Sequence, residues 1–127
     1  MAALYAFSNR IVYGGNAQEL SGILVVETPA TQWAYAVELP LCQDASGDER
    51  AAHLNLEVCV HDGRLGVGIL SRDRREYRQE VHVSPADGQC CALEFIFGRF
   101  SSIGPLIIRN TSGTGPSRGT CRILGAA

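Results

Sequence analysis

Apolar and polar residues alternate with period two along most of this chain. In HLNLEVCVH, residues 53–61, polar or small side chains occupy one face, and the other face carries Leu54, Leu56, Val58 and Val60. This pattern is typical of a half-buried β-strand, in which successive side chains point to opposite faces. No segment shows the sustained i, i+3, i+4, i+7 spacing of an amphipathic helix. The chain is therefore predicted to be all-β.

Seven further segments show strand patterns. In QWAYAVEL, residues 32–39, strict alternation places on one side Trp33, Tyr35, Val37 and Leu39. The other predicted strands are 23–28, 65–70, 77–83, 92–97, 106–109 and 121–124, with a ninth candidate at 10–13. Turn-forming Gly, Pro, Asp and Ser residues separate these segments. About eight short strands with such turns predict an antiparallel β-sandwich of the jelly-roll type.

The chain of 127 residues has the length of one domain, and it contains neither an internal repeat nor a linker. We expect a single domain over 1–127 with its core at about 22–124. The longest irregular stretch, 40–52, is expected to be a solvent loop with room for a short helical turn. Asp62 and Gly63 lie between two predicted strands, and this pair favours a tight hairpin turn.

Composition excludes several classes of protein. Apolar residues make up 46% and charged residues 19% of the chain, and its net charge is −2. All eleven basic residues are arginine, but they are mixed with acidic residues and form no basic face, so nucleic-acid binding is not expected. No apolar stretch is long enough to span a membrane, and no signal peptide is apparent. Five cysteines with irregular spacing predict reduced thiols in a cytoplasmic protein.

Catalytic and metal-binding motifs are absent from the sequence. His53 and His61 share a strand face, but extended chain would separate them by about 26 Å, too far for one metal ion. The sequence also lacks a GxSxG elbow, an SxxK motif and a local cysteine signature. We therefore expect no metal, no cofactor and no enzymatic activity. Glutamates on different strands could meet in space and act as a catalytic pair. A small β-sandwich enzyme acting on glycans is therefore kept as an alternative.

Three residues of the segment SRDRREYRQE and one upstream tryptophan are candidates for ligand binding. The simplest interpretation of residues 71–80 is a solvated loop that enters a strand. Alternatively, Arg72, Asp73 and Tyr77 form a polar patch that binds sugar hydroxyls. Trp33 could supply the flat aromatic ring that commonly covers the C–H face of a sugar, although an aromatic residue that alternates with Val37 is more often part of a core.

The segment GPLIIRNTSGTG, residues 104–115, provides the last candidates. Asn110-Thr111-Ser112 matches a glycosylation sequon, but nothing in the sequence indicates secretion. A phosphate-binding loop needs a lysine, which the chain lacks, and a following helix. The remaining interpretation is a buried strand from whose end Arg109 and Asn110 reach outward to a ligand. Alternatively, Arg109 pairs with a strand glutamate and Asn110 caps a turn.

The segments WAYAVELPL, HLNLEVCVHDGRLGVGILSRD and LIIRNTS resemble the galactose-binding-domain-like jelly rolls, which include many carbohydrate-binding modules. The resemblance covers about residues 22–124, and it is greatest to accessory β-sandwiches beside bacterial glycosyltransferases and sugar-modifying methyltransferases. It implies noncatalytic glycan binding by end loops or a sheet face. Many members of the family hold a structural calcium ion, but this sequence has no Asp-rich run to mark that site.

These observations predict a noncatalytic carbohydrate-binding accessory module. Its expected ligand contacts are Trp33, Arg72, Asp73, Tyr77, Arg109 and Asn110. The alternative is a protein-interaction or self-associating scaffold domain, with a partner protein or a second copy on a sheet face. The expected partner is therefore a carbohydrate or a protein domain, and a homo-oligomer is compatible with either.

Overall fold

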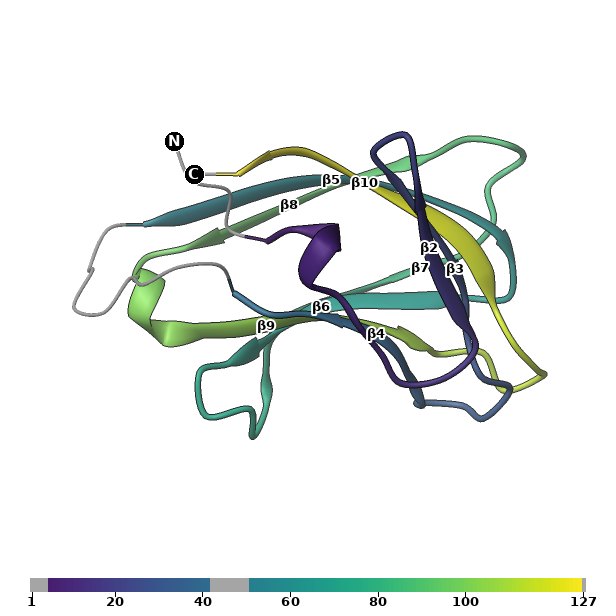
Figure 1. The fold of residues 1–127 in the computed structure, drawn as a ribbon, viewed down its shortest axis with the longest axis horizontal. Helices are drawn as coiled ribbons and strands as arrows, with labels where there is room; N and C mark the ends of the chain where they lie inside the picture. Colours follow the sequence, from purple (N-terminus) through teal and green to yellow (C-terminus); the bar gives the residue numbers. More distant parts are fainter. Residues whose placement is uncertain (1–4, 42–50, 127) are drawn as a thin grey trace.

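A computed structural model describes residues 5–41 and 51–126 of the chain. Two antiparallel five-stranded sheets pack face to face and form a β-sandwich, which confirms the predicted fold class (Figure 1). The described residues form ten strands, rather than the eight that the sequence predicted. Their helices are two 3-10 turns, Phe7–Asn9 and Phe100–Ser102, and neither is long and apolar enough to cross a membrane.

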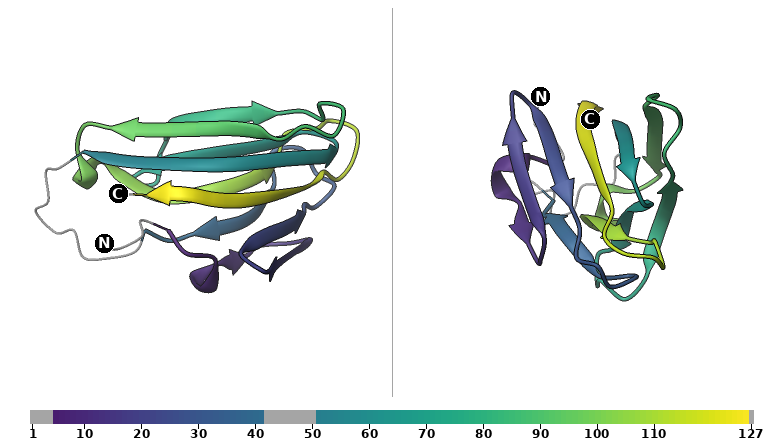
Figure 2. Two further views of the ribbon diagram at one scale, coloured as in Figure 1. Left: turned by 90° about the horizontal axis from the view of Figure 1, so that it is seen from above. Right: turned by 90° about the vertical axis from the view of Figure 1, so that its right-hand side faces the viewer.

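We call the two sheets A and B. Sheet A contains, in spatial order, β1 (Ile11–Val12), β4 (Tyr35–Leu39), β9 (Ile103–Asn110), β6 (Leu65–Ser71) and β7 (Tyr77–Val83). Sheet B contains β2 (Asn16–Leu20), β3 (Ile23–Glu27), β10 (Arg118–Ala126), β5 (Ala52–Asp62) and β8 (Cys91–Phe97). The left view of Figure 2 looks onto sheet B, with β8, β5 and β10 side by side and sheet A behind them.

The unpredicted strand is β2, which forms a hairpin with β3 through Ser21 and Gly22. Only Ala17 of its five residues is buried, so β2 carries almost no alternation that could have identified it. The candidate strand at 10–13 is present as the two-residue β1. Most of the expected loop at 40–52, including its helical turn, lies outside the described residues.

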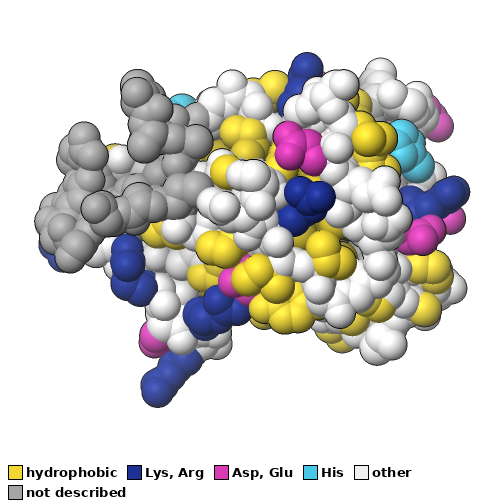
Figure 3. All heavy atoms as spheres, viewed as in Figure 1, with side chains coloured by type: hydrophobic (Ala, Val, Ile, Leu, Met, Phe, Trp, Pro, Cys, Tyr) yellow, Lys and Arg dark blue, Asp and Glu magenta, His cyan; other side chains and the backbone are white. Residues whose placement is uncertain are grey.

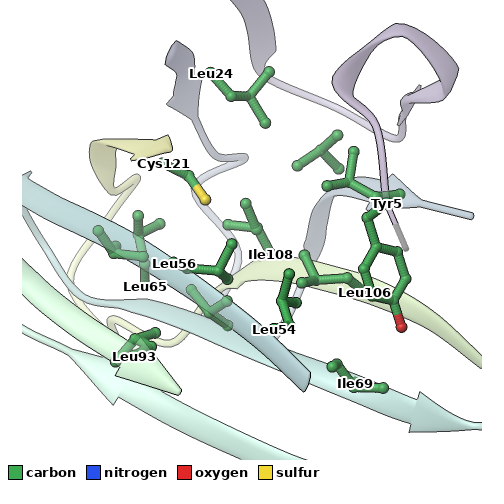
Figure 4. Packing of buried hydrophobic residues seen from close by; sticks show 14 of the residues in the cluster. Tyr5, Leu24, Leu54, Leu56, Leu65, Ile69, Leu93, Leu106, Ile108 and Cys121 are labelled. Carbon is green, nitrogen blue, oxygen red and sulfur yellow. The ribbon is translucent and has the colours of Figure 1, made fainter. Parts of the chain in front are cut away.

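The core lies between the two sheets and follows the predicted alternation. Leu54, Leu56, Val58 and Val60 of β5 are all buried, as are the inward residues of the central strand β9. Figure 4 shows Leu54 and Leu56 of β5 in one cluster with Leu24, Leu65 and Cys121 from other strands. Tyr5 closes the core near Leu106, and its hydroxyl donates a hydrogen bond to the carbonyl oxygen of Gly104 at 2.7 Å. Burial of this apolar surface is the main stabilising contribution.

The turn at Asp62 and Gly63 is confirmed, but the expected hairpin is wrong. It connects β5 of sheet B to β6 of sheet A, and therefore turns a corner of the sandwich. Gly63 has φ +79°, and a Cβ atom at this position would collide with Ser117. The Ser117 hydroxyl accepts a hydrogen bond from the Arg64 amide at 2.8 Å, so this close approach fastens the corner.

The cysteines correct a second expectation, because Cys59 and Cys90 form a disulfide. Cys91 lies opposite Val58 in the ladder between β8 and β5, which puts Cys90 next to Cys59. Of the other cysteines in the described residues, Cys91 is an exposed thiol and Cys121 is a buried thiol. Cys42 lies outside the described residues. Since disulfides are typical of oxidising compartments, the argument for a cytoplasmic protein from five reduced thiols no longer holds.

Removal of the disulfide should destabilise the fold. The bridge closes a loop between residues separated by 31 positions. Its loss in a Cys59→Ser, Cys90→Ser double variant should reduce the free energy of unfolding by about 3 kcal/mol, because the unfolded chain gains conformational entropy. Denaturant unfolding without reductant would measure the difference, and peptide mass mapping would identify the linkage. An unchanged unfolding midpoint, or a linkage through another cysteine, would contradict the assignment.

Candidate functional site

Two β-bulges place tyrosines on the outer face of sheet A. In β4, Tyr35 lies opposite Arg109 and Val37 opposite Ile108, so Ala36 is an extra residue between them. Since Ile108 belongs to the core and Arg109 does not, the bulge turns Tyr35 outward. The sequence pattern, which put Tyr35 and Val37 on one face, is wrong at this point.

The second bulge, in β7, has the same effect on Tyr77. The ladder between β6 and β7 pairs Ile69 with Gln79 and Leu70 with Tyr77, so that Arg78 is the extra residue. Uninterrupted alternation would have put Tyr77 on the same side as Val81 and the buried Val83. The bulge places it instead on the outer face.

Arg109 lies at the centre of a cluster on this outer face. Its guanidinium carbon lies 5.0 Å from the centroid of the Trp33 ring and 4.6 Å from that of Tyr77. Both distances are within the range of cation–π contacts. His82 lies beside the indole, with 6.2 Å between the ring centroids. We call Trp33, Tyr35, Tyr77, Glu80, His82 and Arg109 the aromatic site.

Glu80 holds Arg109 in place through two hydrogen bonds. Arg109 Nε donates to Glu80 Oε2 at 2.7 Å, and Arg109 Nη2 donates to Oε1 at 2.6 Å. Burial acts to raise the pKa of Glu80, but hydrogen bonds and charges of Arg109 and His82 outweigh it, and the net pKa is lowered. The pair is partly accessible, with 18% of the Arg109 side chain and 12% of the Glu80 side chain exposed. The site therefore presents donors and acceptors in fixed positions.

Two glycines of β6 leave room for these side chains. A Cβ atom on Gly66 would lie 2.6 Å from Glu80 Oε2, and one on Gly68 would lie 2.7 Å from Cδ1 of Tyr77. Both distances are too short for real contacts. The LGVGIL pattern of β6 therefore allows Tyr77 and Glu80 of β7 to lie across β6 toward Arg109 on β9.

Tyr77 is a partly buried aromatic residue of the site. Its hydroxyl oxygen is buried and makes no hydrogen bond within the usual distance and angle limits. Burial raises the pKa of this phenol well above its ordinary value, and an interaction with the Tyr35 phenol adds to the rise. Tyr77 therefore stays neutral and contributes its ring to the site.

Trp33 lies at the rim of the aromatic site, not in the core, which overturns the core alternative. Its side chain is 47% exposed. Its backbone has φ +72°, a rare conformation for a bulky residue, and is held by a hydrogen bond from its amide to the Asn110 carbonyl oxygen at 2.6 Å. An exposed, fixed indole is well suited to stack on a ligand.

Asn110 points into the molecule, so its expected outward orientation is wrong. It is fully buried at the end of β9. Its Oδ1 atom accepts hydrogen bonds from the Ser112 amide at 3.0 Å and the Ser117 hydroxyl at 2.7 Å. Its Nδ2 atom lies 3.0–3.2 Å from the carbonyl oxygens of Pro29, Ala30, Thr31 and Gly115. Asn110 ties two loops together, which matches the alternative that it caps a turn.

Arg72 and Asp73 lie outside the aromatic site. Both belong to the loop between β6 and β7, which projects on the outer side of sheet A (Figure 1). Arg72 Nε donates to the Ser101 carbonyl oxygen at 2.8 Å. Asp73 is exposed and accepts hydrogen bonds from the Ser71 hydroxyl and the Arg75 amide, so it stabilises its own turn. The structure thus unites Trp33, Tyr77 and Arg109, but not the other three candidates.

The same face carries a second polar cluster that the sequence did not indicate. Arg74 donates two hydrogen bonds to the Glu38 carboxylate, at 2.6 and 2.9 Å, and the Tyr13 hydroxyl donates a third at 2.6 Å. These bonds lower the pKa of Glu38, with the Arg74 bond contributing most and burial opposing it. Figure 3 shows hydrophobic side chains gathered near the lower margin, where sheet A lies, with basic and acidic side chains among them.

Several of the residues that the sequence analysis missed could have been identified from the sequence. Glu38 and Glu80 are strand glutamates that could have been suspected of pairing with arginine, as the alternative for Arg109 did. His82 alternates with Glu80 on β7, so its place on the same face could be predicted. Tyr35 and Arg74 gave no such signal, because a bulge and a loop conformation decide where they lie.

The described residues contain one group with metal-ligand geometry, and its chemistry argues against a metal ion. Glu57, Cys59 and Cys90 have their ligand atoms within 4.8 Å of one another. However, the two sulfurs are joined as a disulfide, and Arg122 donates to the Glu57 carboxylate at 3.0 Å. A metal ion needs thiolates, which this group does not supply in its oxidised form.

No protein-family model matches the sequence, and no curated protein matches it either. Solved structures of carbohydrate-binding modules do share its fold. One, described as CBM4, has a TM-score of 0.58 with 9% identity over 88% of this chain and 74% of that chain. Another, a variant of a family 29 carbohydrate-binding module called CBM29-2, has a TM-score of 0.56 with 15% identity over 96% and 77%. At these identities the likeness shows the β-sandwich fold.

Loss of the Asn110 side chain should destabilise the protein strongly. Asn110→Ala leaves buried donors and acceptors of two loops without partners, and should reduce the free energy of unfolding by roughly 3 kcal/mol. Asn16→Ala, on the exposed strand β2, is the matched control and should change it by less than about 0.5 kcal/mol. Thermal or denaturant unfolding measures both. Equal effects of the two variants would refute the structural role of Asn110.

The Glu38 carboxylate should make stability depend on pH. Its folded pKa lies below the ordinary value of 4.5, so its stabilisation is present above about pH 4.5 and is lost as the pH falls through the folded pKa. Glu38→Gln should therefore be less stable than the parent at pH 7 and lose less stability between pH 7 and 3. Glu19→Gln, at an exposed position, should behave like the parent. Identical pH profiles for parent and Glu38→Gln would contradict this account.

Proposed function

We propose that this protein is a noncatalytic glycan-binding module and that the aromatic site on the outer face of sheet A is its binding surface. The observation that carries the proposal is the arrangement of Arg109 between an exposed indole and Tyr77, with Glu80 as its fixed partner. The fold shared with carbohydrate-binding modules supports the same conclusion, although a fold alone would not.

The aromatic rings suit the apolar faces of a sugar. A pyranose ring presents C–H groups on its faces, and these pack against a flat aromatic ring. Trp33 offers the largest accessible ring of the aromatic site, and the backbone hydrogen bond to Asn110 fixes its position. A ring that is already in place loses little conformational entropy when the ligand binds.

The Arg109–Glu80 pair suits the hydroxyl groups at the edge of a sugar. A hydroxyl both donates and accepts hydrogen bonds, so two adjacent hydroxyls can donate to Glu80 and accept from Arg109 at the same time. Each ion is already paired with the other, so ligand binding leaves no buried charge without a partner. This chemistry binds a ligand and cleaves no bond, which is why we propose a binding module instead of an enzyme.

Removal of the indole should abolish most glycan binding without loss of the fold. Trp33→Ala should weaken the affinity for a bound glycan by about tenfold or more, which corresponds to about 1.4 kcal/mol of lost contact. Ile96→Ala is the matched control, because Ile96 is an exposed apolar residue of sheet B, and it should leave the affinity unchanged. Affinity electrophoresis against soluble glucans, mannans, xylan and polygalacturonate would find the ligand, and calorimetry would quantify it.

The proposal has two clear ways to fail. A folded protein that binds none of these polysaccharides at millimolar sugar concentration is not a module for such glycans. A glycan that binds equally well to the parent and to Trp33→Ala must bind elsewhere on the molecule.

A further inference from the structure

A second cluster lies on the same face as the aromatic site. It consists of Tyr13, Glu38 and Arg74, and we call it the Arg74 cluster. The Glu38 side chain is only 5% exposed, whereas the Arg74 side chain is 46% exposed and Tyr13 is 51% exposed. The accessible groups are therefore the Arg74 guanidinium and the Tyr13 phenol ring, and both donate hydrogen bonds to the buried Glu38 carboxylate.

We propose that the Arg74 cluster is a second sugar subsite, which extends the aromatic site so that the protein takes an oligosaccharide and not a single sugar. The inference rests on the proposed function, because it assigns the length of the ligand and the second place where it is held. In this assignment Arg74 donates hydrogen bonds to sugar hydroxyls and Tyr13 packs against the ring. Glu38 is a positioning residue that acts through Arg74.

The two clusters form one continuous surface. Tyr35 of the aromatic site contacts Tyr13 edge to face, with 5.6 Å between the ring centroids. Along β9, Arg109 and Ile107 point to the same side, and their ladder partners on β4 are Tyr35 and Glu38. Two residues of strand correspond to about 7 Å, so a chain that starts on Trp33 must be longer than one sugar ring to reach Arg74.

Backbone strain marks both ends of this surface. Among the described residues, four residues other than glycine have positive φ, and two of them, Ser21 and Asp87, precede glycines in turns. The other two are Trp33 at φ +72° and Arg74 at φ +66°. Such a conformation costs about 1–3 kcal/mol and persists where the surroundings enforce it, often at ligand sites. Here it directs one accessible side chain from each cluster, Trp33 and Arg74, onto one face.

A hollow beside the Arg74 cluster combines apolar walls with charged side chains. Its volume is about 210 Å³, below the roughly 300–1,000 Å³ typical of pockets for drug-sized ligands. Apolar walls come from Pro40, Ile103 and Pro105, and polar groups come from Glu38, Arg72 and Arg74. Apolar walls cover C–H groups while the charged pair binds hydroxyls, which is the combination that the aromatic site also offers.

Chain-length dependence tests the second subsite directly. Calorimetric titration with glucose and its β-1,4-linked oligosaccharides of two to six units, and with the matching mannose series, should show affinity rising beyond the monosaccharide. Arg74→Ala should lower the affinity for the longest bound oligosaccharide by about tenfold, the loss expected for a charge-assisted hydrogen bond, and leave the affinity for the monosaccharide unchanged. Trp33→Ala should weaken both. Arg75→Ala is the control in the same loop, because its side chain is 87% exposed.

Two more variants separate binding from folding. Tyr13→Ala removes a packing surface, whereas Tyr13→Phe keeps the ring, so only Tyr13→Ala should lose affinity for long oligosaccharides. Glu38→Gln should also lower that affinity, because it weakens the contact that positions Arg74. Unfolding curves would show that each variant is folded at the assay temperature.

The outcomes distinguish this inference from the proposed function. If no oligosaccharide or polysaccharide binds, both fall together. If a monosaccharide binds as tightly as the oligosaccharides, or if Arg74→Ala and Tyr13→Ala weaken all lengths equally, the second subsite is wrong while the aromatic site stands.

Discussion

The side-chain alternation of β-strands is the constraint on which the outer face of sheet A depends. A strand that buries one face must turn every second side chain outward, and a single extra residue exchanges the two sets. β4 and β7 each contain such a residue, at Ala36 and Arg78. Upstream of each bulge lies a tyrosine, so the core keeps its aliphatic residues while Tyr35 and Tyr77 reach the surface. The aromatic site therefore depends on the bulges in β4 and β7, which turn Tyr35 and Tyr77 to the outer face.

Two adjacent residues at the end of β9, Arg109 and Asn110, have different roles. Arg109 faces outward, pairs with Glu80 and contacts two aromatic rings. Asn110 faces inward and fastens the β3–β4 loop to the β9–β10 loop, and its carbonyl oxygen accepts a hydrogen bond from the Trp33 amide. In the proposed function, Arg109 contacts the ligand while Asn110 supplies the rigidity that this contact needs. Their roles are coupled, since the loop that Asn110 anchors is the one that carries Trp33.

Sequence reasoning was most accurate where one face of a strand is buried and the other exposed. The alternation of residues 53–61 located β5 and its core residues, and the segment 77–83 agrees with β7 at both ends although its bulge breaks the alternation. It failed at β2, whose residues are nearly all exposed, and at the two bulges, which leave no mark in a period-two pattern. The disulfide was missed because only the register between β5 and β8 brings Cys90 to Cys59.

The candidate site was predictable in part for the same reason. Arg109 and its pairing with a strand glutamate followed from the end of a buried strand. The contribution of Arg74 did not, because it depends on a positive φ inside a charged loop that looks merely solvated. Loop conformation is set by local hydrogen bonds such as those of Asp73, and alternation carries no information about them. Arg109, Glu80 and His82, which lie on regularly alternating parts of strands, were therefore accessible to sequence reasoning, whereas Tyr35 and Arg74 were not, because a bulge and a loop conformation place them.

The central claim is that a glycan binds on the outer face of sheet A against Trp33. This residue is the only tryptophan of the chain, so its fluorescence reports on that position alone. Titration of the folded protein with a polysaccharide that retards it in affinity electrophoresis should produce a saturable change in tryptophan emission, with the same midpoint as calorimetry. Binding that saturates in calorimetry while the emission of Trp33 stays constant would contradict the claim.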